Sequence, residues 1–365
     1  MAKTNQFPKT TLSGVAAESD KLKTVLISAM VEVSGHVRFG DGTDIDTTIT
    51  ETDMVLNPNG DSVHKFIWAG SKRRGVDRRT IHQMRNRYWQ DTNCYIPQLC
   101  GQCPTCWLYG FTGTTQDANS VIKKLGINAK SRIHYPTSVS IETVEQGQNR
   151  HNRNMVDEKK QTTAGEAGIH KEQVIVAGVH FPIYTSAMQV LDWELGAFAH
   201  ALLENLNANR YTAASRAQGG VRWATDYKDA PILVVDESSD GIFPLNVPKI
   251  SGWETDYQHK VINPFLEATS KESIKSSFEL MGFEIGEGDD SPTVKHDSNC
   301  LFNISFNGND NVIIKQNGEI KMTRYQGNAA LGYLRRCQLA WQSYLNELQT
   351  GEFWKDVNSY VEAIK

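Results

Sequence analysis

Alternating apolar residues near the beginning of the chain predict a long strand. Within Thr24–Phe39, the apolar side chains that share one face are Val25, Ile27, Ala29, Val31 and Val33. A period of two is typical of a half-buried strand. A polar, glycine-rich loop follows at 40–48, and the short apolar run Phe66–Gly70 predicts a buried strand.

Beyond residue 70 the apolar residues recur with a helical period. We expect a helix from Ser71 to about Trp89. Three residues with 3–4 spacing form its packing stripe: Ile81, Met84 and Tyr88. A second stripe, roughly a quarter turn away, carries basic side chains: Arg74, Arg78, His82 and Arg85. The basic residues are therefore aligned along the predicted helix.

Two further predicted strands, Pro136–Glu145 and Gln173–Ile183, enclose 27 mostly polar residues. A structureless loop of that length is uncommon in a compact domain unless it has a function. We therefore interpret the whole unit as a protruding β-arm.

The second half of the chain predicts more helices and strands. Val190–Asn207 has an apolar face typical of an amphipathic helix, and Ala329–Leu348 predicts another long helix. Strands are predicted at Leu301–Phe306 and Val312–Met322, the latter a hairpin that turns at Asn317-Gly318. The element order indicates an α+β fold with helices on one face of an antiparallel sheet.

Charge is unevenly distributed although the net charge is only −4. Between Lys72 and Arg87, seven basic residues face one acid, whereas Pro231–Cys300 holds thirteen acids and five lysines. A basic strip on a mildly acidic protein is typical of a localised polyanion site. The alternative is a solvated helix face whose acidic partners lie elsewhere.

Composition excludes several classes of protein. Hydrophobic residues make up 39% of the chain and charged residues 22%, so it is not wholly disordered. No apolar run approaches the roughly 20 residues of a membrane span, and the first residues have no apolar signal segment. Six cysteines are too few for a disulfide scaffold. We expect a cytoplasmic protein.

Four cysteines predict a metal site: Cys94, Cys100, Cys103 and Cys106. Cys-x2-Cys turns present two sulfurs to one ion, and a closed set of four thiolates is typical of structural Zn2+. An iron–sulfur run would place its next ligand at Gly110, which has no side chain. Cys94 is the weakest member of the set, and His82 or His134 can replace it if it points away.

Three acids follow the first predicted strand: Asp41, Asp44 and Asp46. Their oxygens can hold Mg2+ or Ca2+, although the spacing does not fit an EF-hand. The alternative is a solvated turn. We find no nucleophile–base or phosphate-loop motif elsewhere in the sequence.

Together these features resemble the Cas-seven family, the RAMP-type backbone subunits of CRISPR effector complexes. The resemblance rests on the first strand with its Gly/Asp loop, the unit FIWAGSKRRGVDRRTIHQMR, the arm with RHNRN, and the Gly219-Gly220-x-Arg222 turn. The inserted CGQCPTCWLYG is similar to the type I-D Cascade version. The likeness covers roughly Thr24–Trp223.

The resemblance implies an RRM-like (ferredoxin-like) antiparallel palm, an inserted zinc-binding region and a β-hairpin thumb. The first part of the palm would take residues 18–90 and the zinc-binding insertion 91–135. Palm strands would take 136–185, with the thumb at 147–172, and the rest of the palm with further insertions 186–365.

By resemblance the chain binds CRISPR RNA, stacks on copies of itself along the guide, and presents the guide to target DNA or RNA. Its other partners would be the large subunit, the subunit at the guide 5′ end and the guide-processing endonuclease. Residues implied in gripping the RNA backbone are Ser71, Lys72, Arg73, Arg74, Arg78, Arg79 and Arg85. Thumb and turn residues implied in RNA contact are His151, Arg153, Met155, Gly220 and Arg222.

The resemblance also suggests a nuclease alternative, because type III relatives cleave target RNA with an aspartate of the first loop. Asp44 or Asp46 occupies the comparable place here, and Mg2+ would be required. A generic single-strand-binding protein is a third interpretation. We expect a structural RNA-binding subunit rather than an enzyme.

Overall fold

The computed structural model describes residues 22–40, 50–85, 94–96, 98–99, 103–111, 128–154, 156–157, 159–160, 162–163, 169–211, 219–248, 250–254, 256–285, 293–296, 300–307 and 310–349. Helices and antiparallel sheets alternate through these residues, so the α+β prediction is confirmed.

A ten-stranded antiparallel sheet forms the body of the described chain. Its central strands, in spatial order, are β17 (Glu319–Gln326), β12 (Leu233–Ser238), β1 (Lys23–Val33), β10 (His180–Val190) and β4 (Ile133–His134). Strand β11 (Val221–Trp223) pairs with the end of β1. Beyond β17 the sheet continues through β16 (Asn311–Gln316), β15 (Cys300–Phe306), β14 (Thr293–His296) and β13 (Glu284–Ile285).

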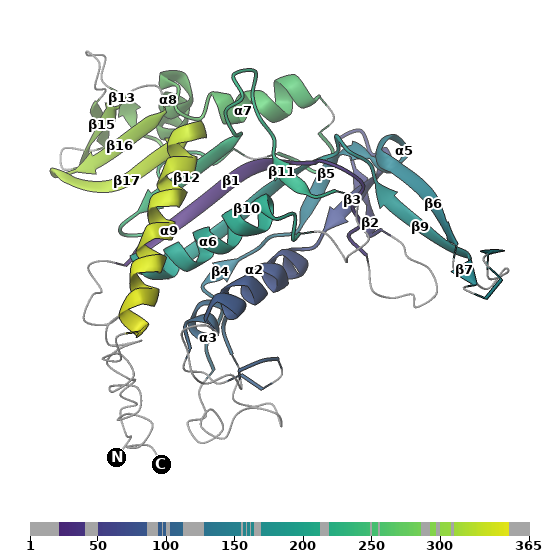
Figure 1. Cartoon of the computed structure of the whole chain (residues 1–365). Coiled ribbons are helices and arrows are strands. Elements are labelled where there is room, and N and C mark those ends of the chain that lie inside the picture. Colours follow the sequence, from purple (N-terminus) through teal and green to yellow (C-terminus); the bar gives the residue numbers. More distant parts are fainter. Residues whose placement is uncertain are drawn as a thin grey trace.

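Three long helices cover one face of this sheet (Figure 1). They are α2 (Gly70–Arg85), α6 (Asp192–Asn207) and α9 (Gly327–Gln349). The alternating apolar residues of β1 are almost fully buried in the same core cluster as Ile81, Leu195 and Leu334 of these helices. The predicted placement of helices on one face is confirmed.

The opposite face of the sheet is covered by short elements. The π-helix η3 (Tyr257–Ile262) and helix α7 (Asn263–Leu266) enclose Met30 of β1 and Val234 of β12. A further core lies between the C-terminal strands and helix α8 (Lys271–Leu280), where Phe278 and Ile314 are fully buried.

A buried ion pair joins the C-terminal strands to the rest of the sheet. Arg324 of β17 donates two hydrogen bonds of 2.7 Å to Asp236 of β12, and both side chains are 1% exposed. The same guanidinium donates to the carbonyls of Ala268 and Asn246. The charged pair is thereby well satisfied, which a buried ion pair requires.

The predicted hairpin between β16 and β17 is confirmed. Asn317 and Gly318 have φ values of 52° and 85°, the left-handed conformations that a two-residue hairpin turn of this kind needs.

A smaller sheet carries the arm. It consists of β2 (Thr52–Leu56), β3 (Ser62–Trp68) and β5 (Ser138–Thr143). After β5 the short helix α5 (Val144–Gly147) leads into β6 (Gln148–Asn154), which pairs with β9 (Ile169–Ile175). At the arm's far end β7 (Val156–Asp157) pairs with β8 (Thr162–Thr163). Figure 1 shows this hairpin projecting away from the body, so the predicted arm is confirmed.

Two strand predictions were wrong. The first strand ends at Val33 rather than near Phe39, because residues 34–40 leave the sheet to meet the arm and residue 50. The predicted strand Gln173–Ile183 is two strands, β9 and β10, separated by a turn at Gly178, whose φ is +88°. One strand belongs to the arm and the other to the main sheet. None of the described helices is both long and apolar enough to cross a membrane.

Candidate nucleic-acid interface and metal site

The basic helix α2 begins at a glycine because the backbone of another segment touches it. A Cβ on Gly70 would lie 1.7 Å from the carbonyl oxygen of Tyr135. No side chain fits in that space, so α2 starts directly against the segment that precedes β5. Exposed Ser71 follows Gly70 directly, so we expect this contact to hold its backbone in one place.

Arg73 is a core residue, contrary to the prediction that it grips RNA. Its side chain is 3% exposed and lies over the rings of Trp68 and Tyr135, at 5.5 and 5.8 Å from their centroids. It donates to the carbonyls of Pro136 and Tyr184. A phosphate cannot reach this guanidinium in the folded chain, so we remove Arg73 from the candidate interface.

Asp77 accepts hydrogen bonds from three segments that meet behind α2. Tyr135 and Asn205 donate to its carboxylate at 2.8 Å each, and the hydroxyl of Tyr211 donates as well. Asp77 is fully buried, and burial raises its pKa to about 6, while these hydrogen bonds and nearby Arg73 lower it. This network fixes α2 against α6 and β4. Apart from one acid within a basic helix, no feature of the sequence indicated this network.

Two of the remaining basic residues of α2 contact neighbouring segments, one at helix α3 and one at Glu51. Arg74 donates to the carbonyl of Tyr109, the last residue of helix α3 (Pro104–Tyr109). A cation suits that helix end, where the carbonyls lack partners within the helix. Burial raises the pKa of the Tyr109 phenol, and nearby Arg74 and Arg78 oppose that rise, whereas Arg79 is exposed. Lys72 forms an ion pair of 2.8 Å with Glu51.

The arm is joined to the body through residues 172–179, which we call the arm root. Val37 and Ile175 form a bridge with two backbone hydrogen bonds, and Arg38 pairs with Glu172 of β9 at 3.2 Å. The hydroxyl of Thr50 donates to the carbonyl of Gln173. The segment that carries Glu51 is therefore in direct contact with the arm root.

The predicted glycine turn lies at the end of β1. A Cβ on Gly219 would lie 2.2 Å from Gly35, so the two backbones touch. Ser34 and Gly220 exchange hydrogen bonds, and Gly220 itself is buried. Arg222 follows on β11 with a side chain that is 64% exposed. Of the two predicted turn residues, only Arg222 is accessible to a ligand.

Some predicted site residues lie outside what the structure describes. This applies to Cys100, to Met155, to the acidic loop with Asp41, Asp44 and Asp46, and to the side chains of Arg85, His151 and Arg153. The nuclease interpretation depends on that loop and stays a prediction.

Three of the four predicted cysteine ligands converge. The sulfur of Cys94 lies 3.6 Å from that of Cys103 and 3.4 Å from that of Cys106, and all three side chains are fully buried. Around a tetrahedral zinc with bonds of about 2.3 Å, sulfurs would be about 3.8 Å apart, so this set fits such an ion. In the part of the chain that is described, neither His82 nor His134 joins the group. Cys94 therefore points inward, as the four-cysteine prediction requires.

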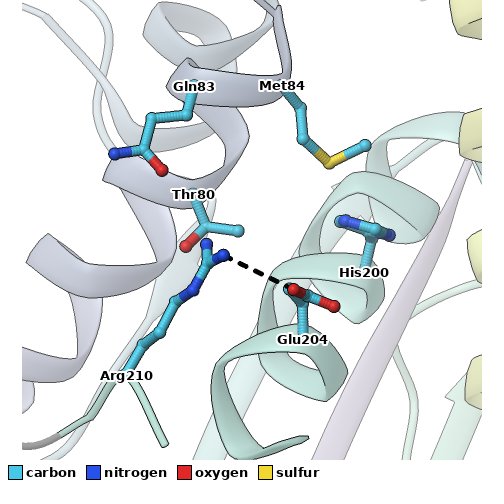
Figure 2. A pocket seen from close by; sticks show the side chains of 6 residues that line it. All are labelled: Thr80, Gln83, Met84, His200, Glu204 and Arg210. Atoms are coloured by element: carbon cyan, nitrogen blue, oxygen red, sulfur yellow. Dashed lines mark hydrogen bonds and ion pairs between the residues drawn. The ribbon is translucent and has the colours of Figure 1, made fainter. Parts of the chain in front are cut away.

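A pocket that sequence reasoning missed lies between α2 and α6 (Figure 2). It is about 260 Å³ and is lined by Thr80, Gln83, Met84, His200, Glu204 and Arg210. Arg210 pairs with Glu204 at 3.5 Å, and burial lowers the pKa of His200. None of the predicted RNA-binding residues whose side chains the structure describes lines it. Its lining residues come from segments that are distant in sequence, so no local pattern could have predicted the pocket.

The family whose model matches this chain is described as Csc2 CRISPR, and the match covers residues 69–224. This stretch runs from the start of α2 through the cysteines, the arm and α6 to the Arg222 turn. No curated protein matches the chain.

Three solved structures resemble the fold. The crystal structure of Thermofilum pendens Csc2 is 14% identical, covers 72% of this chain and 78% of that chain, and has a TM-score of 0.40. A type IV-B CRISPR complex is 12% identical, with coverages of 65% and 99% and a TM-score of 0.39. The Csm3–Csm4 subcomplex of a type III-A CRISPR–Cas interference complex is 12% identical, with coverages of 59% and 80% and a TM-score of 0.30.

Proposed function

We propose that this chain is a CRISPR RNA-binding backbone subunit of a type I-D Cascade complex, a Cas-seven type protein whose copies stack along the guide. The observation that carries the proposal is the Csc2 CRISPR family match over residues 69–224. That range contains every element of the candidate interface except the first strand and the segment that follows it. The guide held in this way would pair with target DNA or RNA.

The strand order supports the RRM-like palm that this role implies. The strands β1, β4, β10 and β12 lie in the order β12-β1-β10-β4, with α2 between β1 and β4 in sequence and α6 between β10 and β12. A ferredoxin-like βαββαβ unit has this connectivity. We accordingly propose a palm built from 18–90, 136–185 and part of 186–365, interrupted by the cysteine-rich insertion at 91–135 and the thumb at 147–172.

Accessible cations beside the arm root support an RNA backbone that runs along this part of the chain. Contacts tie Lys72 and Arg222 to this part of the chain, and Ser71 and Arg79 lie exposed on the same helix as Lys72. Lysine and arginine attract phosphates whatever the base sequence, so such an interface can hold a guide of any sequence. The arm itself, 147–172, would close over the RNA.

The phosphate contacts are tested by the salt dependence of binding. In Lys72→Ala/Arg222→Ala, two cations are lost, and each phosphate contact on a single strand contributes a slope of roughly −0.7 to log K against log salt. We expect binding to unrelated RNA sequences to weaken about equally and the slope to flatten by roughly 1.4 units. Lys275→Ala on α8, which makes the same kind of charge change far from the arm, should leave the slope unchanged. An unchanged slope in the double variant, or a loss confined to particular sequences, would contradict the proposal.

We also propose that the cysteine set holds one structural Zn2+, with Cys100 as the fourth ligand. Three buried sulfurs at the observed separations support this proposal. A closed four-thiolate site stabilises the fold and leaves no open position for catalysis.

Elemental analysis of the purified chain should find about one zinc per molecule. Cys103→Ser should lower that content and reduce solubility, because the sulfur it removes is buried beside that of Cys94. Cys337→Ser, a buried cysteine outside the group, is the matched control and should keep the metal. Metal-free protein, or iron with visible absorbance, would show that the zinc assignment is wrong.

A further inference from the structure

We propose that Glu51 and Glu32 set the threshold for RNA binding by holding Lys72 and Arg222 in ion pairs that the RNA backbone must break. This inference rests on the proposed RNA-binding function and adds two residues that determine its selectivity. A single phosphate gains little binding free energy when it must displace the glutamate from one ion pair. An RNA that contacts several cations at once is therefore favoured over a short or loosely bound strand.

The first pair combines a mobile cation with a fixed acid. Lys72 and Glu51 are joined at 2.8 Å, with side chains 34% and 30% exposed. The backbone of Glu51 is held on both sides, since its N–H donates to Phe39 and its carbonyl accepts from Ile67. Lysine has a long flexible side chain, so it can turn toward a phosphate while the carboxylate stays in place.

The second pair has the same character. Arg222 donates to both carboxylate oxygens of Glu32, at 3.2 to 3.4 Å. The arginine side chain is 64% exposed and the glutamate only 23%. Glu32 lies within β1, paired across the sheet with His180 on one side and Arg222 on the other. The acid is again part of the rigid sheet, and the cation is the partner that can leave.

Contacts bring both pairs to the arm root. Glu51 follows Thr50, whose hydroxyl donates to the arm residue Gln173. Glu32 precedes Val33, which exchanges backbone hydrogen bonds with Gly178 and Val179 at the end of the arm root. Arg38 and Glu172 form a third pair there, but their side chains are only 21% and 11% exposed. That pair fastens the arm and is not part of this proposal.

The pairs determine how much charge the interface offers to RNA. Each acid offsets the charge of the cation that it pairs with, although Lys72 belongs to the most basic stretch of the sequence. Exposed ion pairs are weak, so RNA can displace the acids but gains less from each contact than it would from a free cation. The acids therefore weaken the binding of an RNA that contacts only one cation, but they do not prevent the binding of an RNA that contacts several.

Glu51→Gln and Glu32→Gln test the proposal because they remove the charge and keep a hydrogen-bonding side chain of the same size. Each should tighten binding to a short RNA about 1.4- to fivefold, which is the range that exposed ion pairs span. Each should also steepen the salt slope, and the ratio between long and short RNA should fall. Glu279→Gln breaks the exposed Lys275–Glu279 pair on α8 and is the matched control, for which we expect no change.

A second comparison shows whether Glu51 acts through its partner. In a Lys72→Ala background, Glu51→Gln should no longer tighten binding. Unchanged or weaker binding in both glutamine variants would overturn the inference, and so would a gain that persists without Lys72, because the acid would then act as a general negative charge. If the unaltered chain binds no RNA, the proposed function itself is wrong. If the chain binds RNA and the substitutions leave its affinity unchanged, only this inference is wrong.

Discussion

Asp77→Ala should lower the free energy of unfolding by about 3–5 kcal/mol, the range for removing one partner of a buried charged network. The substitution leaves the hydroxyls of Tyr135 and Tyr211 and the amide of Asn205 without their acceptor. Each unsatisfied buried group costs about 1–3 kcal/mol. The buried guanidinium of Arg73 also loses a negative charge that favours its charged form.

Denaturant unfolding of Asp77→Ala beside the unaltered chain measures this loss. The matched control is Asp192→Ala, which removes an exposed carboxylate from the Lys23 ion pair and should cost no more than about 1 kcal/mol. Equal losses in the two variants would show that the Asp77 network does not hold α2 in place.

Asp77 should also make the stability depend on pH. Its pKa is raised from 3.8 to about 6 in the folded chain, so folding favours the protonated form. The stabilising contribution of protonation is complete below about pH 4 and is lost as the pH rises through about 6. Asp77→Asn has no such titration, so the difference in unfolding free energy between it and the unaltered chain should change with pH across this interval. A difference in unfolding free energy that stays constant from about pH 4 to about pH 6 would mean that Asp77 does not titrate in this interval.

Deletion of Asn152–Gly168 should leave a folded chain that binds RNA about tenfold more weakly or worse, since even one stacking contact on a base is worth about 1–3 kcal/mol. The deletion joins His151 to Ile169, which keeps the inner pairs of the arm from Gln148–Ile175 to His151–Glu172. The Arg38–Glu172 pair and the bridge to Val37 also remain. The body should therefore unfold as cooperatively as before.

Circular dichroism with denaturant unfolding tests the fold of the deletion variant, and equilibrium binding to a single-stranded RNA tests its function. A full-length arm with His151→Ser, Arg153→Ser and Met155→Ser separates the effect of those side chains from the effect of arm length. If the deletion unfolds the chain, the arm is part of the core and our interpretation is wrong. Unchanged RNA binding would remove the arm from the interface.

The parts of the fold that could be predicted from sequence depend on local patterns. The Asn317-Gly318 turn has positive φ at both residues, and few other dipeptides adopt that conformation easily. The apolar stripe of α6 and the alternation along β1 report burial on one side of each element. The polar composition of the arm indicated a hairpin outside the core, and β6 and β9 form it.

The predictions that failed depend on contacts between distant segments. Arg73 shares its helix with other residues that were predicted to grip RNA. The carbonyls of Pro136 and Tyr184 and the rings of Trp68 and Tyr135 make its burial tolerable. The end of β1 depends on Gly219, which is far away in sequence and touches Gly35. Helical or strand periodicity contains no information about such partners.

The cysteine set lies between these two cases. Cys-x2-Cys spacing identified the residues, because the turn geometry that brings two sulfurs together is local. The convergence of the Cys94 sulfur on those of Cys103 and Cys106 joins residues nine and twelve positions apart, which spacing alone does not determine. The ion pairs of Lys72 and Arg222 with Glu51 and Glu32 were invisible in the sequence for the same reason.

The identity of the nucleic acid that co-purifies with the full-length chain, expressed together with a CRISPR array, tests the central claim most directly. A guide-binding backbone subunit should retain RNA of one discrete length class whose sequence derives from the array, in particles whose mass corresponds to several copies of the chain per RNA. RNA of many lengths and sequences, or a monomer free of nucleic acid, would contradict the account.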